Sequence, residues 1–355
     1  MNSITWKLAI LSMLVVPLGG CTSHPKIFQF ERGDSAEKMV WPRAPETARY
    51  EYVGQITGEP NFVYAPGKGP IGIKRFFLWV AGIVTGKKVS QVLQRPQAVL
   101  VDEHGRIYVT DISRQGVIVF DAVRGQLFVY ADAATGQRFK TPLGMARNAE
   151  GQLWVADADL GFVSILDKNG LPKGKLSHAS LKRPVGVALD EKSGWIYVAD
   201  AWEHNIKVFH RDGQLLKTIA KHGEGPGELN GPTYISLLQD KLYVSDTLNA
   251  RVQIFSKEGK FLQKIGQRGQ LIGDFSKPKG IALDRHRHVY IVDSLHDHLL
   301  VYDERGQFLL PIGGEGSEIG QFYLPAGVFV DGRNQIYIAD MFNSRVVVLR
   351  YLEGV

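Results

Sequence analysis

Apolar and polar positions repeat along this chain in short strands and lack the 3.6-residue stripe of an amphipathic helix. Each unit begins with a proline, continues as an apolar strand, turns at acidic or glycine residues, and reaches a second strand that ends in aspartate. Successive strand-end aspartates are 46, 43, 46, 47 and 47 positions apart; they are Asp111, Asp157, Asp200, Asp246, Asp293 and Asp340. A period in the mid-forties built of short strands predicts the blades of a β-propeller.

The fifth unit shows four strands most clearly. Residues 279–284 predict an inner strand, whose glycine and alanine allow strands to crowd at the axis. Residues 289–293 and 299–303 are rich in β-branched and aromatic side chains, and residues 308–312 form the outer strand after a turn. We therefore expect an all-β fold, a six-bladed β-propeller.

Two segments carry a family resemblance. Asp-Thr-Leu-Asn-Ala-Arg-Val at residues 246–252 and Asp-Met-Phe-Asn-Ser-Arg-Val at residues 340–346 resemble NHL-repeat proteins, and the resemblance implies six NHL repeats over residues 95–350. The first three repeats depart from the Asn-x-Arg pattern. This departure argues against a uniform six-fold binding surface.

The sixth unit stops too early to supply its own outer strand, which would leave two open sheet edges. Residues 52–57 match the outer strands at 215–220 and 261–266 position by position. We therefore predict that residues 49–60 are the closing strand of the last blade and that they join the two ends of the chain.

The first twenty residues are typical of an export signal, with Lys7 followed by an apolar run too short to span a bilayer comfortably. The signal ends in Leu-Gly-Gly-Cys, which resembles the lipobox of bacterial lipoproteins, and this implies lipidation of Cys21. Residues 1–20 are then the lipoprotein signal peptide and residues 21–48 a tether. An ordinary signal peptide with a chance cysteine is the alternative. We expect a lipid-anchored protein of the bacterial cell envelope, with the propeller in the periplasm.

Residues 61–94 predict an apolar insertion between the closing strand and the first blade. Its centre is apolar on all sides and basic at both ends, but it is too short for a transmembrane helix. Three interpretations stay open: a segment packed over one face of the ring, a membrane-dipping anchor through Phe76, Phe77 and Trp79, or a docking site for another protein.

Sequence signals for catalysis are weak. Propeller lyases carry zinc-binding histidines just after the proline of the inner strand, but here those positions hold no strong metal ligand; they are Gln97, Leu143, Val185, Thr233, Lys279 and Ala326. The six aspartates are expected to accept backbone N–H bonds in tight turns. His286 and His288 should lie at the opposite end of their blade from His296 and His298, which are expected to be solvated turn residues, with a weak metal site as the alternative. We expect no cofactor and no resident metal.

The formal net charge of +6 is modest for 355 residues, and export would remove nucleic acid as a partner. The turns after the second strands should emerge on one face, which we predict to be the binding face; its candidates are Trp202, His204, Asn249, Arg251, His296, His298, Phe342, Asn343 and Arg345. The leading hypothesis is a noncatalytic scaffold for an envelope protein. The alternatives are a lyase-type or lactonase-type enzyme, or a module that binds polysaccharide or small ligands.

Overall fold

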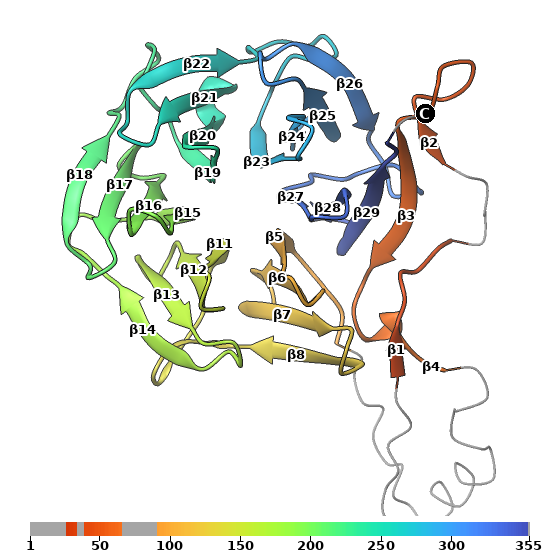
Figure 1. Cartoon of the computed structure of the whole chain (residues 1–355), viewed down its shortest axis with the longest axis horizontal. Helices are drawn as coiled ribbons and strands as arrows, with labels where there is room; N and C mark the ends of the chain where they lie inside the picture. Colours follow the sequence, from red (N-terminus) through yellow and green to blue (C-terminus); the bar gives the residue numbers. More distant parts are fainter. Residues whose placement is uncertain (1–25, 34–38, 66–90, 354–355) are drawn as a thin grey trace, which may run out of the picture.

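The computed structural model describes residues 26–33, 39–65 and 91–353, and it shows six antiparallel sheets arranged radially around an axis (Figure 1). Five blades are continuous in sequence. Their strands, from the axis outward, are β5 (Pro96–Val101), β6 (Ile107–Asp111), β7 (Gly116–Asp121) and β8 (Gln126–Tyr130) in blade 1; β11 (Pro142–Arg147), β12 (Leu153–Asp157), β13 (Phe162–Leu166) and β14 (Pro172–Leu176) in blade 2; β15 (Pro184–Asp190), β16 (Trp195–Asp200), β17 (Asn205–His210) and β18 (Leu215–Ile219) in blade 3; β19 (Pro232–Leu238), β20 (Lys241–Asp246), β21 (Arg251–Ser256) and β22 (Phe261–Ile265) in blade 4; and β23 (Pro278–Leu283), β24 (Val289–Asp293), β25 (His298–Tyr302) and β26 (Phe308–Gly313) in blade 5.

Blade 6 combines the two ends of the chain. Its inner three strands are β27 (Val328–Val330), β28 (Gln335–Asp340) and β29 (Arg345–Tyr351), and β3 (Tyr50–Ile56) pairs antiparallel with β29 as the outer strand. Three side chains of β3 are almost fully buried in the cores on the two sides of blade 6: Tyr50 is 2%, Val53 4% and Ile56 0% exposed. Burying three such side chains stabilises the closed ring by about 1.5–3 kcal/mol each.

The segment expected to be a tether is partly built into the ring, which corrects the boundary at residue 48. β1 (Lys26–Phe28) pairs with β4 (Phe62–Tyr64), and β2 (Val40–Trp41) extends the sixth sheet beyond β3. The aromatic residues explain the difference, because Phe28, Phe30 and Trp41 pack against the cores on either side of β3.

The predicted insertion leaves and rejoins the ring at one place. A short 3₁₀ turn, η1 (Glu59–Asn61), precedes β4, and the Leu93 N–H donates to the Thr57 carbonyl at 2.7 Å. Cys21, Phe76, Phe77 and Trp79 lie outside the described residues. In the part of the chain that the structure describes, no helix has the length and hydropathy needed to cross a membrane.

The cores lie between neighbouring blades, where the second and third strands of each sheet are buried on both faces. Small residues let the inner strands approach one another: a Cβ on Gly280 would lie 2.5 Å from the Val328 nitrogen. The remaining short elements are β9 (Asp132–Ala134), β10 (Gln137–Arg138) and η2 (Thr247–Asn249).

Candidate functional site

The strand-end aspartates organise one face of the propeller, which we call the loop face: the turns after the second strands and the connections between blades. Asp111 is fully buried, and its Oδ2 accepts the N–H groups of Gln94 and Arg95 while Oδ1 accepts those of Ser113 and Arg114. Equivalent bonds recur at the other five aspartates. The predicted structural role is confirmed, and each carboxylate fixes both the loop before its blade and the turn inside it.

The Asn-x-Arg residues of blade 4, which were predicted to lie on the binding face, bond to their own blade and to the connection before it. The Asn249 Nδ2 donates to the Gly223 carbonyl and to Asp246, both at 2.9 Å. The Arg251 guanidinium, 11% exposed, donates to Asp246 at 2.7 Å and to the carbonyls of Gly225 and Glu228. Both side chains therefore hold the glycine-rich connection that enters their blade.

Blade 6 repeats this arrangement. Asn343 donates to the Gly316 carbonyl and to Asp340, each at 2.8 Å. Arg345, 8% exposed, pairs with Asp340 at 2.8 Å and donates to Gln55 of the closing strand and to three carbonyls of the connection before the blade. The polar ends of both side chains therefore bond within the protein.

The histidines are separated as the strand order predicts. The Nδ1 of His288 donates to the Asp284 carboxylate (2.7 Å) at one end of blade 5. The Nδ1 of His296 lies 3.2 Å from Asp293 on the loop face, and that of His298 contacts the His296 carbonyl. The Nδ1 of His204 accepts the Gly231 N–H, and burial followed by the charge of His222 lowers the pKa of His204. Among the described residues, no three His, Cys, Asp or Glu side chains are grouped so that they could hold a metal ion.

Exposed apolar side chains form an arc on the loop face at the second position after the strand-end aspartate. The apolar arc consists of Trp202 (70% exposed), Leu248 (50%), Leu295 (50%) and Phe342 (45%), in blades 3 to 6. Ser113 and Asp159 occupy the same position in blades 1 and 2. The sequence prediction included Trp202 and Phe342 but missed the two leucines, although their place in the repeat is the same.

Basic side chains gather inside this arc, next to the prolines that begin the inner strands. The basic rim consists of Arg95, Lys140, Lys182, Arg183, Lys277 and Lys279, and none of the twelve residues directly before the six prolines is acidic. One rim residue is ion-paired to a nearby acid, since Arg183 lies 2.9 Å from Asp159. Burial, with a smaller contribution from Lys277, lowers the pKa of Lys279 to about 8.

The axis is lined by both apolar and polar side chains. A cavity of about 260 Å³ is lined by inner-strand residues of all six blades, among them Leu100, Val187, Leu237, Ile281 and Phe329. At one end Tyr234 reaches across from blade 4 and donates to the Gln97 carbonyl of blade 1 at 2.7 Å. The channel therefore presents hydrocarbon together with the side chains of Arg147 and Ser236 and the bridging Tyr234 phenol.

Comparisons with known proteins agree with this architecture. A sequence model described as a six-bladed β-propeller matches residues 229–294 and 285–351, and one described as the NHL repeat matches residues 181–209. The chain folds as a six-bladed β-propeller, and its matched segments are similar to NHL repeats.

NHL-repeat-containing protein 4 from Homo sapiens is 37% identical over 86 residues, and its Mus musculus counterpart is 36% identical over 81 residues. These matches cover 24% and 23% of this chain and 65% and 58% of the relatives, so the NHL propeller aligns with less than two thirds of each.

Solved structures share the fold at low sequence identity. A protein of unknown function from Bacteroides thetaiotaomicron has a TM-score of 0.60 at 16% identity, covering 73% of this chain and 70% of that one. An auxiliary nutrient binding protein from the same organism has a TM-score of 0.58 at 12% identity, covering 74% and 70%. Virginiamycin B lyase from Staphylococcus aureus has a TM-score of 0.52 at 14% identity, covering 73% and 96%. Likeness at this level shows the fold alone.

Proposed function

We propose that this NHL propeller is a lipid-anchored scaffold of the cell envelope that binds a protein partner noncatalytically through its loop face. The observation that carries the proposal is the apolar arc, in which four blades present a large apolar side chain to solvent at one repeat position. Aromatic and aliphatic anchors of this kind dominate protein interfaces.

The arc is displayed on a rigid framework. The backbone N–H of Trp202 donates to Asp200, that of Leu295 to Asp293, and that of Phe342 to the Tyr323 carbonyl. Because each turn is held by a buried carboxylate or a neighbouring loop, the backbone that carries the exposed side chains loses little conformational freedom when a partner binds. Preorganisation of this kind lowers the entropic cost of association.

The basic rim defines the partner's charge. Five of its six members are exposed at the starts of the inner strands, inside the apolar arc. An acidic protein surface with apolar residues at its edge would complement both features, and the attraction would speed encounter and depend on salt.

Anchoring rests on the sequence around Cys21. Two or more acyl chains on this residue, at about 0.8 kcal/mol per buried methylene, would hold the propeller at a membrane. A Cys21→Ala variant should therefore leave the membrane fraction; a variant that stays there after a salt wash would contradict the lipid anchor.

Photo-crosslinking in cells tests the binding face. A photoreactive amino acid is placed at Trp202, Leu248 or Phe342, and for control at Val123 or Leu171, which are 80% and 60% exposed in turns at the opposite end of the blades. We expect the three loop-face positions to capture one common protein that the control positions do not. Capture of that protein from the control positions, or of no protein from the loop face, would refute the proposal.

A further inference from the structure

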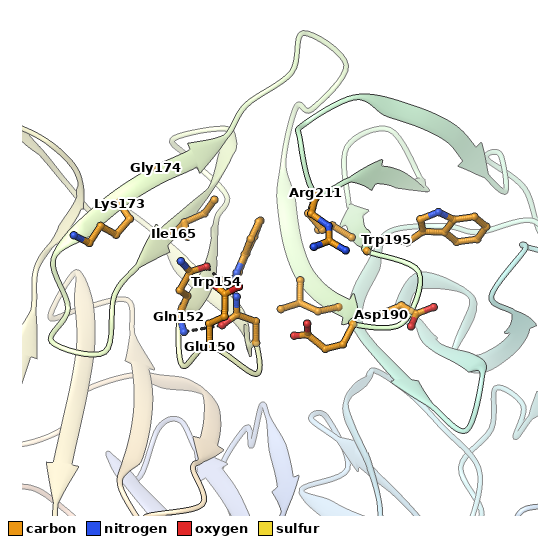
Figure 2. A pocket seen from close by; sticks show the side chains of 14 residues that line it. Glu150, Gln152, Trp154, Ile165, Lys173, Gly174, Asp190, Trp195 and Arg211 are labelled. Atoms are coloured by element: carbon orange, nitrogen blue, oxygen red, sulfur yellow. Dashed lines mark hydrogen bonds between the residues drawn. The ribbon is translucent and has the colours of Figure 1, made fainter.

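A second concave site lies away from the loop face, in a cleft between blades 2 and 3 (Figure 2). Its volume is about 320 Å³, at the lower end of the roughly 300–1,000 Å³ typical of small-molecule sites. One wall is the β11–β12 turn with Trp154 and Ile165, and the other is the β15–β16 turn with Arg211.

The cleft lies where the repeat is broken. The second strands of the other five blades carry tyrosine at the position of Trp154, and in blades 1, 5 and 6 its hydroxyl donates to an aspartate in the turn before it; the pairs are Tyr108 with Asp102, Tyr290 with Asp284, and Tyr337 with Asp331. In blade 2, Trp154 replaces the tyrosine and Asn148 replaces the aspartate.

The replacement brings no internal hydrogen bond. The buried Nε1 of Trp154 has no partner among the described residues, and Asn148 instead bonds Gln152 through both its side-chain atoms. A buried N–H without a partner lowers stability. Stability alone therefore does not explain why blade 2 departs from its neighbours.

Arg211 faces Trp154 across the cleft, whereas the side chains of Lys173, Asp190 and Trp195 point away from it (Figure 2). The guanidinium lies against Gly194, where a Cβ would come within 2.9 Å of its Nε. The Arg211 side chain forms no hydrogen bond or ion pair with another of the described residues. A glycine thus leaves space for a guanidinium whose donors are free.

Acceptors complete the lining. Glu191 extends from blade 3 towards blade 2, and one of its carboxylate oxygens accepts the Ala149 N–H at 3.0 Å. The exposed Glu150 lies on the blade 2 side of the cleft. Gln152 adds an amide whose oxygen accepts from Asn148. Arg211 would repel a cationic ligand, and the two glutamates would repel an anionic one. A neutral ligand with many hydroxyl groups can bond both, because each hydroxyl donates and accepts.

We propose that the cleft between blades 2 and 3 binds a neutral saccharide, one or two sugar units long. Ile165 and Leu189, with the exposed edge of the largely buried Trp154, supply apolar surface for the sugar's C–H groups, while Arg211, Gln152 and Glu191 bond its hydroxyls. The proposal is independent of the partner on the loop face, because the cleft is formed by the turns at the other end of the blades.

Calorimetric titration of the full chain with maltose, cellobiose and N,N′-diacetylchitobiose tests it, with glucuronic acid and glucosamine as charged counterparts. We expect at least one neutral disaccharide to bind more tightly than either charged sugar. Arg211→Met should weaken that binding about tenfold or more, because charge-assisted hydrogen bonds are lost. Arg305→Met is the matched control, since Arg305 occupies the corresponding turn of blade 5 and is exposed away from the cleft.

Thermal melting of both variants shows whether they fold, and Glu191→Gln offers a second test that keeps an acceptor for the Ala149 N–H. Glu191→Gln should weaken binding while leaving melting unchanged. The proposal is overturned if no neutral disaccharide binds, if a charged sugar binds best, or if Arg211→Met and Arg305→Met bind equally well.

Discussion

Replacing Arg345 by methionine tests whether the Asn-x-Arg arginines stabilise the ring. The guanidinium donates to Asp340, to Gln55 of the closing strand, and to the carbonyls of Ser317, Glu318 and Gln321. Asp340 is fully buried, so Arg345→Met leaves a carboxylate without its cation. Removing one partner of a buried ion pair costs about 3–5 kcal/mol. We therefore expect the free energy of unfolding to fall by about that amount, because the methionine keeps much of the stem but none of the donors.

The assay is guanidinium chloride denaturation followed by circular dichroism. Arg350→Met is the matched control, because Arg350 lies on the same strand as Arg345 and pairs at 3.2 Å with Glu51 of β3, but is 45% exposed. Exposed pairs contribute about 0.2–1 kcal/mol. Asp340→Asn combined with Arg345→Met should recover part of the loss, since the uncompensated charge is removed. An Arg345→Met variant as stable as Arg350→Met would refute the structural role and return Arg345 to the candidates for binding.

Two further predictions concern ring closure and the basic rim. Ile56→Ala, in the closing strand, should lower the free energy of unfolding by about 2–5 kcal/mol, whereas Val63→Ala, at a residue 37% exposed, should cost well under half of that; equal melting temperatures for Ile56→Ala and the parent protein would argue against closure by β3. Lys279, with a pKa of about 8, is charged below that pH and neutral above it, so affinity for an acidic partner should fall as the pH rises from 7 to 9, and Lys279→Met should abolish this step. The lowered pKa also affects stability, because the unfolded chain, with a lysine pKa of about 10.4, binds more protons at this group than the folded chain does. The contribution of Lys279 to the free energy of unfolding should therefore increase as the pH rises from 8 towards that value, which a pH series of melting curves would detect.

The sequence predicts the blades because their determinants are local and repeated. In blades 1 to 5 the proline that opens the inner strand and the aspartate that ends the second strand are cross-strand partners, as Pro96 with Asp111 and Pro278 with Asp293. The match between residues 52–57 and two outer strands likewise assigns β3 to the outer edge of a blade from the amino-acid pattern alone.

The candidate site was harder to predict, because the sequence of a single repeat does not show whether a side chain points to solvent or into the protein. Arg251 and Arg345 were placed on the correct face, but a guanidinium beside a turn could point outward to a partner or inward to a loop. The informative signal was a correlation: the blades that carry Asn-x-Arg are entered by the connections Gly-Glu-Gly-Pro-Gly at 223–227 and Gly-Gly-Glu-Gly at 313–316. Leu248 and Leu295 carry no polar or aromatic group that would indicate binding, and they become notable only because Trp202 and Phe342 occupy the same position in their repeats.

The cleft between blades 2 and 3 is formed by residues of two repeats, so neither repeat alone predicts it. Trp154 and Asn148 are unremarkable in blade 2 alone, and Arg211 belongs to the next blade. The free guanidinium becomes visible only when the two blades are packed side by side with Gly194 between them.

Affinity for the protein captured at the loop face tests the central claim most directly. Binding of the purified partner to the parent chain, to Trp202→Ala and to Leu171→Ala is measured by calorimetry at one salt concentration. Truncation of a large aromatic anchor costs about 2 kcal/mol or more, so Trp202→Ala, at the most exposed member of the arc, should bind more than tenfold more weakly while Leu171→Ala binds as the parent does. Equal affinities for all three proteins would contradict a binding role for the loop face.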